Sequence, residues 1–360
     1  MTKRRYKISQ LTLSLCLAIG LISAVNGQTP QPTPKKEPAP ATPKREMPPK
    51  PMSVPIPVGP RAMPPQGERV TTEKSIMVAP DVSIKLCVLE GKLKINGWER
   101  DEVRLFVKEG SRAGIKVLEK GGESGKPVWL LVSNMSRPGA GRGQFSDCIY
   151  GETVEMDVPM KASLTVSGRT THTTVDSVKK IIIQNVEGNI ALRNIPGGIS
   201  ATTYQGDVSV ENSSGAISLE SAEGNVIAFE VNPGQIGDLF KAKTNSGAIS
   251  LQRVEHRQIE ANSISGSLLF NGKFLSGGLY RFKTSAGSIR MLLPADSLCT
   301  VKASYGYGVL SSELPLKIIT QNVTSGGKNV VGTIGEGDAA AGATVNLTTV
   351  SGRIGIGKQP

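Results

Sequence analysis

Aromatic side chains and histidine are scarce in this chain, and each scarcity excludes a class of site. Phe, Trp and Tyr make up only 4% of the 360 residues, so the sequence offers no extended aromatic platform for stacking sugar rings. Neither His172 nor His256 has a nearby cysteine or repeated acid that would complete a nucleophile and its base. We expect both histidines to be solvent-facing residues of strands or loops, and a lone histidine does not predict a metal site.

Cysteine is also rare. Cys16 lies in an N-terminal apolar stretch, which leaves Cys87, Cys148 and Cys299, and their spacing matches no metal-ligand motif. Three cysteines in an exported chain allow either one disulfide with a free thiol or three buried thiols. We favour a disulfide between Cys87 and Cys148, because both precede the regular repeats described below.

A hydrophobic run of membrane-spanning length is missing as well. The apolar stretch from Leu11 to Ile22 follows four basic residues and falls short of the roughly 20 residues that a spanning helix needs. Together with the small-residue site at Val25-Asn-Gly27, it predicts a secretory signal peptide at residues 1–27 and an exported protein, periplasmic, cell-envelope or extracellular, with no transmembrane span after cleavage. An uncleaved membrane anchor is the alternative.

Residues 28–67 contain 14 of the 23 prolines, mixed with Lys, Thr, Ala and Gln. This composition predicts a disordered, extended linker, either a plain spacer or one whose basic residues contact the cell wall. The formal charge of +12 is concentrated here: the first 27 residues carry four positive charges, and residues 28–67 carry six positive and two negative. About +4 is left for the remainder, which predicts no nucleic-acid partner and only weak attraction to an anionic envelope polymer.

Glycine is abundant, and it forms a repeat. Nine times a glycine is followed at its second and fourth positions by apolar residues, at Gly91, Gly188, Gly206, Gly215, Gly224, Gly247, Gly266, Gly287 and Gly352. Period-two alternation puts the two apolar side chains on one side of the chain. Each instance therefore predicts a turn that leads into a short strand with one buried face, and glycine suits a corner that needs positive φ.

Five of these corners share a longer template, with a Ser or Thr three positions before the glycine: Thr203, Thr244, Ser263, Thr284 and Thr349. A ladder of ligand-binding hydroxyls is one interpretation. We favour a structural one, in which the stacked hydroxyls satisfy corner backbone groups and each other.

The spacing of the glycines predicts the fold. The glycines from Gly188 to Gly287 recur about every 20 residues, and a unit of that size buries its apolar face only by stacking on its neighbours. We therefore expect residues 68–360 to form an all-β domain, a β-solenoid with two strands per coil and coils about 4.8 Å apart. Its less regular first third is either a looser set of coils or a small β-sandwich continuous with the solenoid, and we expect helix in the signal peptide alone.

Several segments together resemble a known family. They are Leu89-Glu-Gly-Lys-Leu-Lys-Ile-Asn-Gly-Trp98, the Val158-Pro159 to Gly168 segment, the serial glycine turns, Leu293-Pro294 through Gly308, and the closing Thr349-Val-Ser-Gly-Arg-Ile-Gly-Ile356. Over about residues 80–357 the chain is similar to the bacterial putative-adhesin family of β-strand-repeat domains, a family of unknown function. The resemblance implies the solenoid fold and export.

Candidate catalytic groups are sparse. The densest acids, Asp207, Glu211, Glu220, Glu223 and Glu230, do not recur at coil spacing, so they predict solvated surface rather than the paired carboxyls of a glycosidase. We predict no catalytic, cofactor-binding or metal-binding residues. The expected function is non-catalytic binding of an envelope polymer, glycan or surface protein, with a carbohydrate-active enzyme on a β-helix as the alternative.

Overall fold

The computed structural model describes residues 69–121, 125–135, 147–337 and 342–360, within a unit that runs from Met63 to Pro360. All regular secondary structure in these ranges is β-strand, which confirms the all-β prediction. The signal peptide expected at residues 1–27 and the linker expected at 28–67 lie outside the described residues.

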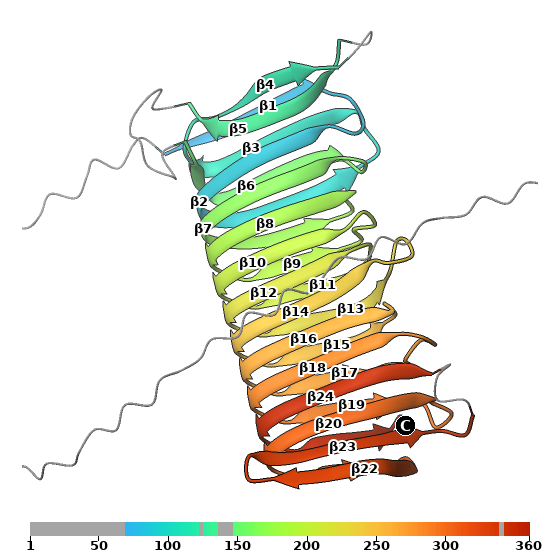
Figure 1. The fold of residues 1–360 in the computed structure, drawn as a ribbon. Coiled ribbons are helices and arrows are strands. Elements are labelled where there is room, and N and C mark those ends of the chain that lie inside the picture. Colours follow the sequence, from blue (N-terminus) through green and yellow to red (C-terminus); the bar gives the residue numbers. More distant parts are fainter. Residues whose placement is uncertain (1–68, 122–124, 136–146, 338–341) are drawn as a thin grey trace, which may run out of the picture. The chain divides into compact units, whose positions relative to one another are not determined.

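The strands form two stacks, shown one strand under another in Figure 1. In spatial order the first stack contains β4 (Ala113–Lys120), β5 (Pro127–Asn134), β2 (Ser83–Trp98), β7 (Ser163–Asp176), β8 (Lys180–Glu187), β10 (Ile199–Gln205), β12 (Ile217–Glu223), β14 (Leu239–Ser246), β16 (Gln258–Ser265), β18 (Leu279–Ala286), β24 (Ala343–Ser351), β20 (Cys299–Tyr307), β23 (Gly327–Ile334) and β22 (Leu316–Thr324).

The second stack follows the same order of coils. It contains β1 (Val70–Met77), β3 (Glu102–Gly110), β6 (Ile149–Pro159), β2, β7, β9 (Ile190–Arg193), β11 (Val208–Ser214), β13 (Val226–Asn232), β15 (Ile249–Val254), β17 (Leu268–Asn271), β19 (Ile289–Leu293), β25 (Ile354–Lys358) and β21 (Leu310–Ser312). The long strands β2 and β7 run through both stacks, so each coil consists of one strand or half-strand from each stack, as the sequence predicts.

The core lies between the two stacks. Parallel pairing in register places the apolar residue of one coil above that of the next, as in the column Val208, Val226, Ile249, Leu268. All nine apolar pairs that follow the repeat glycines are buried. Because every coil contributes to one continuous apolar layer, a single coil gains its stability mainly from its neighbours.

Glycine and hydroxyl residues build the corner between the stacks. All nine repeat glycines have positive φ, from 102° at Gly215, which lies at the opposite corner between β11 and β12, to 159° at Gly287. A Cβ atom at Gly247 would in addition overlap the carbonyl oxygen of Gly224 in the neighbouring coil. The corner therefore requires glycine for both its backbone conformation and its close contact along the stack.

The first third of the unit continues the same coils, in agreement with the first of the two expected arrangements. Strand β2 pairs in parallel with β7 on one side and with β5 and β6 on the other. The antiparallel strands β1, β3 and β4 then close this end of the stacks. The first coil in the sequence is thus enclosed between two later ones.

The opposite end repeats this arrangement. The last two strands, β24 and β25, pair with β18 and β19 on one side and with β20 and β21 on the other. Figure 1 shows β24, red because it is late in the sequence, between β18 and β20. The antiparallel hairpin of β22 and β23 then covers the edge of β20. The hairpin thus pairs the edge of β20 and makes β22 the outermost strand at this end of the described stack.

The disulfide prediction is confirmed. Cys87 in β2 is bonded to Cys148, directly before β6, and the bridge joins residues 61 positions apart. Cys299 is a free, fully buried thiol at the start of β20. Burial raises the pKa of this thiol to about 11, so it stays protonated and unreactive near neutral pH.

Candidate functional site

The corner hydroxyls form hydrogen bonds to backbone carbonyls within the fold. Thr284 donates to the carbonyl oxygen of Gly266 at 2.9 Å, and Thr349 donates to that of Gly287 at 3.0 Å. Equivalent bonds from the buried Thr203, Ser221, Thr244 and Ser263 end on the corner glycine of the adjacent coil. These hydroxyls are therefore occupied inside the fold, as the structural interpretation expects, and present no ladder to a ligand.

The acids that are densest in the sequence do not converge. Glu220 forms an ion pair with Lys243 at 2.6 Å on the first stack, whereas Glu230 pairs with Arg253 at 2.7 Å on the second. Asp207 lies at the corner, where its carboxylate accepts the backbone N–H of Asn225 in the next coil at 2.7 Å. Glycoside hydrolysis needs two carboxyls that face one groove, and these acids do not provide them.

The two histidines differ, and the prediction for one of them is wrong. His172 is exposed on β7 and its Nδ1 accepts the backbone N–H of Asn189 at 3.3 Å. His256, expected to face solvent, is fully buried after β15, where its Nε2 lies 2.8 Å from the carbonyl oxygen of Gly215 and its ring contacts Phe240. The sequence could not show this, because His256 fills space beside a loop two coils away. Burial lowers the pKa of its imidazole.

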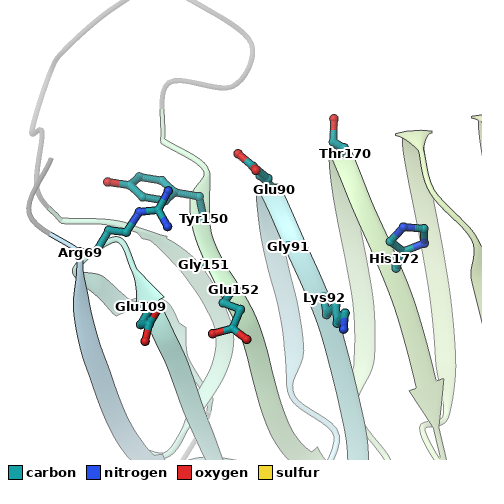
Figure 2. A pocket seen from close by; sticks show the side chains of 10 residues that line it. All are labelled: Arg69, Glu90, Gly91, Lys92, Glu109, Tyr150, Gly151, Glu152, Thr170 and His172. Carbon is teal, nitrogen blue, oxygen red and sulfur yellow. The ribbon is translucent and has the colours of Figure 1, made fainter. Parts of the chain in front are cut away.

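A hollow of about 400 Å³ lies near the first coil, where the pairing of β2 with β6 is interrupted by register shifts. Its lining comes from β2, β3, β6, β7 and the residue before β1: Arg69, Glu90, Gly91, Lys92, Glu109, Tyr150, Gly151, Glu152, Thr170 and His172. Figure 2 shows Arg69 beside Tyr150, with His172 on the other side of the view. The hollow thus brings together three carboxylates and three basic side chains.

The charge state of the Glu152 carboxyl is set by a neighbour. Lys108 lies 2.9 Å from Glu152 and lowers the pKa of that carboxyl through a hydrogen bond and charge attraction. A general acid that works near neutral pH needs a raised pKa instead. Glu152 is therefore suited to an ion pair and not to proton donation.

A second candidate surface lies on the outer face of the first stack, and we call it the basic face. It comprises the exposed side chains of Lys241, Lys243, Arg281, Lys283 and Lys302. They come from β14, β18 and β20, and parallel pairing places them in two straight columns across neighbouring strands. Sequence reasoning missed this face, because the columns depend on which strands pair.

Within the described ranges, no group of three or more His, Cys, Asp or Glu residues is arranged to hold a metal ion. The same ranges contain no helix with the length and apolarity needed to cross a membrane.

Solved structures of other proteins align with this chain at low similarity. A putative cell adhesion protein from Clostridium sporogenes aligns at 13% identity and a TM-score of 0.25, covering 81% of this chain and 100% of that one. A putative adhesin from Bacteroides fragilis aligns at 10% identity and a TM-score of 0.32, covering 81% and 97%. A putative adhesin from Parabacteroides merdae aligns at 11% identity and a TM-score of 0.30, covering 81% and 96%.

No curated protein matches the sequence. The profile of the Toastrack DUF4097 family, by contrast, matches residues 151–357, from β6 through β25, and so includes all the regular coils and the inserted last one. The match covers more than half of the chain, and it agrees with the serial glycine corners and the two parallel stacks. The chain belongs to the Toastrack DUF4097 family, a family of domains of unknown function.

Proposed function

We propose that this protein is an exported, non-catalytic binding protein that uses the outer surface of its solenoid for adhesion or envelope interaction. The observation that carries the proposal is the outer face of the first stack, where parallel pairing in register holds exposed polar side chains in straight columns from coil to coil. Such a surface can make many weak contacts with a repetitive partner, and those contacts add through avidity. An envelope polymer, glycan or surface protein fits that description.

Export is supported by two independent features. The start of the sequence has the pattern of a signal peptide, and Cys87 and Cys148 are joined by a disulfide, which persists mainly in oxidising compartments. Intact-mass measurement of the protein from its native envelope should give a chain that begins at Gln28. A mass that retains Met1 would show an uncleaved anchor and contradict this part of the proposal.

Binding is tested with the full chain on a panel of envelope polymers and glycans and on whole cells. The native protein should bind at least one of them, and the same protein, reduced and unfolded in urea and then applied, should not. A native protein that binds none of the polymers, glycans or cells would overturn the proposed function.

A carbohydrate-active enzyme is the second candidate, and one observation favours it. The hollow near the first coil is lined by Glu90, Glu109 and Glu152, and carboxyls that share a concave site are what sugar cleavage uses. The ion pair of Glu152 with Lys108 leaves Glu90 and Glu109 as the candidate pair. Release of reducing ends from a polysaccharide, abolished in both Glu90→Gln and Glu109→Gln while the fold is kept, would establish this alternative.

A further inference from the structure

The basic face has a defined order of side chains. One column runs Ser218, Lys241, Glu260, Arg281, Asn346, Lys302, from β12 to β20. The column beside it runs Glu220, Lys243, Asn262, Lys283, Thr348, Ser304 across the same strands. Neighbouring strands lie about 4.8 Å apart, so Lys243 and Lys283, two strands apart, have a backbone separation of about 10 Å.

The charges on this face do not cancel. The two acids are each already engaged, Glu220 with Lys243 at 2.6 Å and Glu260 with Arg281 at 2.6 Å. Lys241, Lys283 and Lys302 are exposed and form no ion pair with any residue that the structure describes. The three unpaired lysines lie two or four strands apart, about 10–20 Å along the stack, and the Debye length at physiological salt is about 8 Å, so each acts as a separate positive position and its attraction for an anion is sensitive to salt.

The insertion of the last coil shapes the face. Because β24 lies between β18 and β20, Asn346 and Thr348 separate the cations of β18 from Lys302. Uncharged amide and hydroxyl groups therefore separate the cations along the second column and beside Lys302, whereas Glu260 lies between Lys241 and Arg281 in the first. This arrangement matches a chain that carries negative charges at intervals, with hydrogen-bonding groups between them.

We propose that the basic face binds an extended acidic polysaccharide, one whose sugar residues carry carboxylates, and this proposal rests on the binding function proposed above. The lysines pair with the carboxylates, and Asn262, Asn346 and Thr348 hydrogen-bond the sugar hydroxyls between them. A nucleic acid fits less well, because the two columns contain no aromatic side chain on which bases could stack. The in-register alignment of the columns suits a linear polymer.

The test uses the full chain and polygalacturonate as the probe, with neutral dextran and single-stranded DNA for comparison. The variant Lys241→Gln/Lys283→Gln/Lys302→Gln removes the three unpaired charges. The control variant Lys116→Gln/Lys120→Gln/Lys161→Gln removes the same charge from exposed positions far along the stack. We expect salt-sensitive binding of polygalacturonate, weakened at least about tenfold by the first variant and changed less than about twofold by the control.

Each outcome is decisive. If both variants lose polygalacturonate binding equally, net charge alone determines the binding, and this inference is overturned. If DNA binds as strongly as polygalacturonate, the face is an unspecific polyanion surface, and the inference is overturned as well. Binding to other glycans or cells without binding to polygalacturonate would also overturn it while leaving the proposed function intact. Unfolding midpoints of the two variants, expected to be equal, show that a lost fold does not mimic lost binding.

Discussion

At the scale of single residues, the corner glycines have the least tolerance for change. Gly247 has a φ of 151°, and its Cα faces the backbone of Gly224 in the next coil. Gly326, in the turn between β22 and β23, has free space around the position of a Cβ. The two positions therefore form a matched pair for the same substitution.

We expect Gly247→Ala to lower the free energy of unfolding by at least about 2 kcal/mol, because alanine disfavours this φ and its methyl group would overlap a carbonyl. Gly326→Ala should stay within about 0.5 kcal/mol of the parent protein. Urea denaturation of both variants measures the difference. Similar midpoints for the two would show that the corners do not constrain the stack.

The register of the strands is tested by two adjacent residues of β15. Ile249 is 1% exposed in the core, whereas the next side chain, Ser250, points to the outer face. Ile249→Asp places a carboxylate in a dry apolar layer and should lower the free energy of unfolding by at least about 3 kcal/mol. Ser250→Asp should lower it by less than about 1 kcal/mol. Equal melting temperatures would contradict the register.

His256 should make the stability of the protein depend on pH. Its folded pKa is lowered from 6.5, chiefly by burial, against smaller opposing effects of the hydrogen bond to Gly215 and of the charge on Asp238. Below pH 6.5 the unfolded chain therefore binds a proton that the folded chain does not, so stability falls as pH falls, by up to about 1.4 kcal/mol per pH unit until the folded pKa is reached.

The measurement is urea unfolding between pH 7.5 and pH 5. His256→Gln, whose amide can still donate to the carbonyl of Gly215, should flatten the decline, whereas His172→Gln at an exposed position should preserve it. An unchanged decline in His256→Gln would assign the pH dependence to other groups.

At the scale of elements, the inserted strands β24 and β25 hold the last coils together. They contribute Val345, Leu347, Ile354 and Ile356 to the core and supply hydrogen-bonding partners on both sides. Each such side chain contributes about 1.5–3 kcal/mol when buried. The last two strands are therefore structurally interior, although they end the sequence.

In a chain that stops after residue 337, the free energy of unfolding should fall by several kcal/mol. The amides of β18 to β21 should also lose protection from exchange, because both neighbours of the missing coil are left with open edges. Strands β8 to β12, several coils away, should keep their protection and serve as the internal control. Hydrogen exchange followed by mass spectrometry resolves the two regions. Full protection of β18 and β20 in the shortened chain would contradict the inserted topology.

At the scale of the whole unit, the stacks need closure at both ends, and the disulfide helps at one of them. Cys87→Ser/Cys148→Ser should lower the free energy of unfolding by about 2–4 kcal/mol, because the bridge restricts 61 residues of the unfolded chain. Reducing agent should lower the urea midpoint of the parent protein to that of the double variant, and it should leave the midpoint of the double variant unchanged. A midpoint insensitive to reductant would show that the bridge adds nothing to stability.

The local sequence pattern was sufficient to predict the structure of a single coil. The alternation after Gly206 or Gly247 determines which side chains are buried, and the Thr three positions before each of these two glycines donates to a corner carbonyl. These features were predictable because they depend on backbone geometry within a few residues. The pairing of Cys87 with Cys148 was also favoured correctly, from position relative to the repeats.

Only the tertiary structure decided the order of the coils. Every coil has nearly the same apolar pattern, so the pattern does not say that β24 inserts between β18 and β20 or that β2 lies between β6 and β7. The basic face, the hollow at the first coil and the burial of His256 all depend on those long-range neighbours. Parallel pairing joins residues far apart in the chain, and a period-two alternation specifies a strand's buried face without specifying its partner.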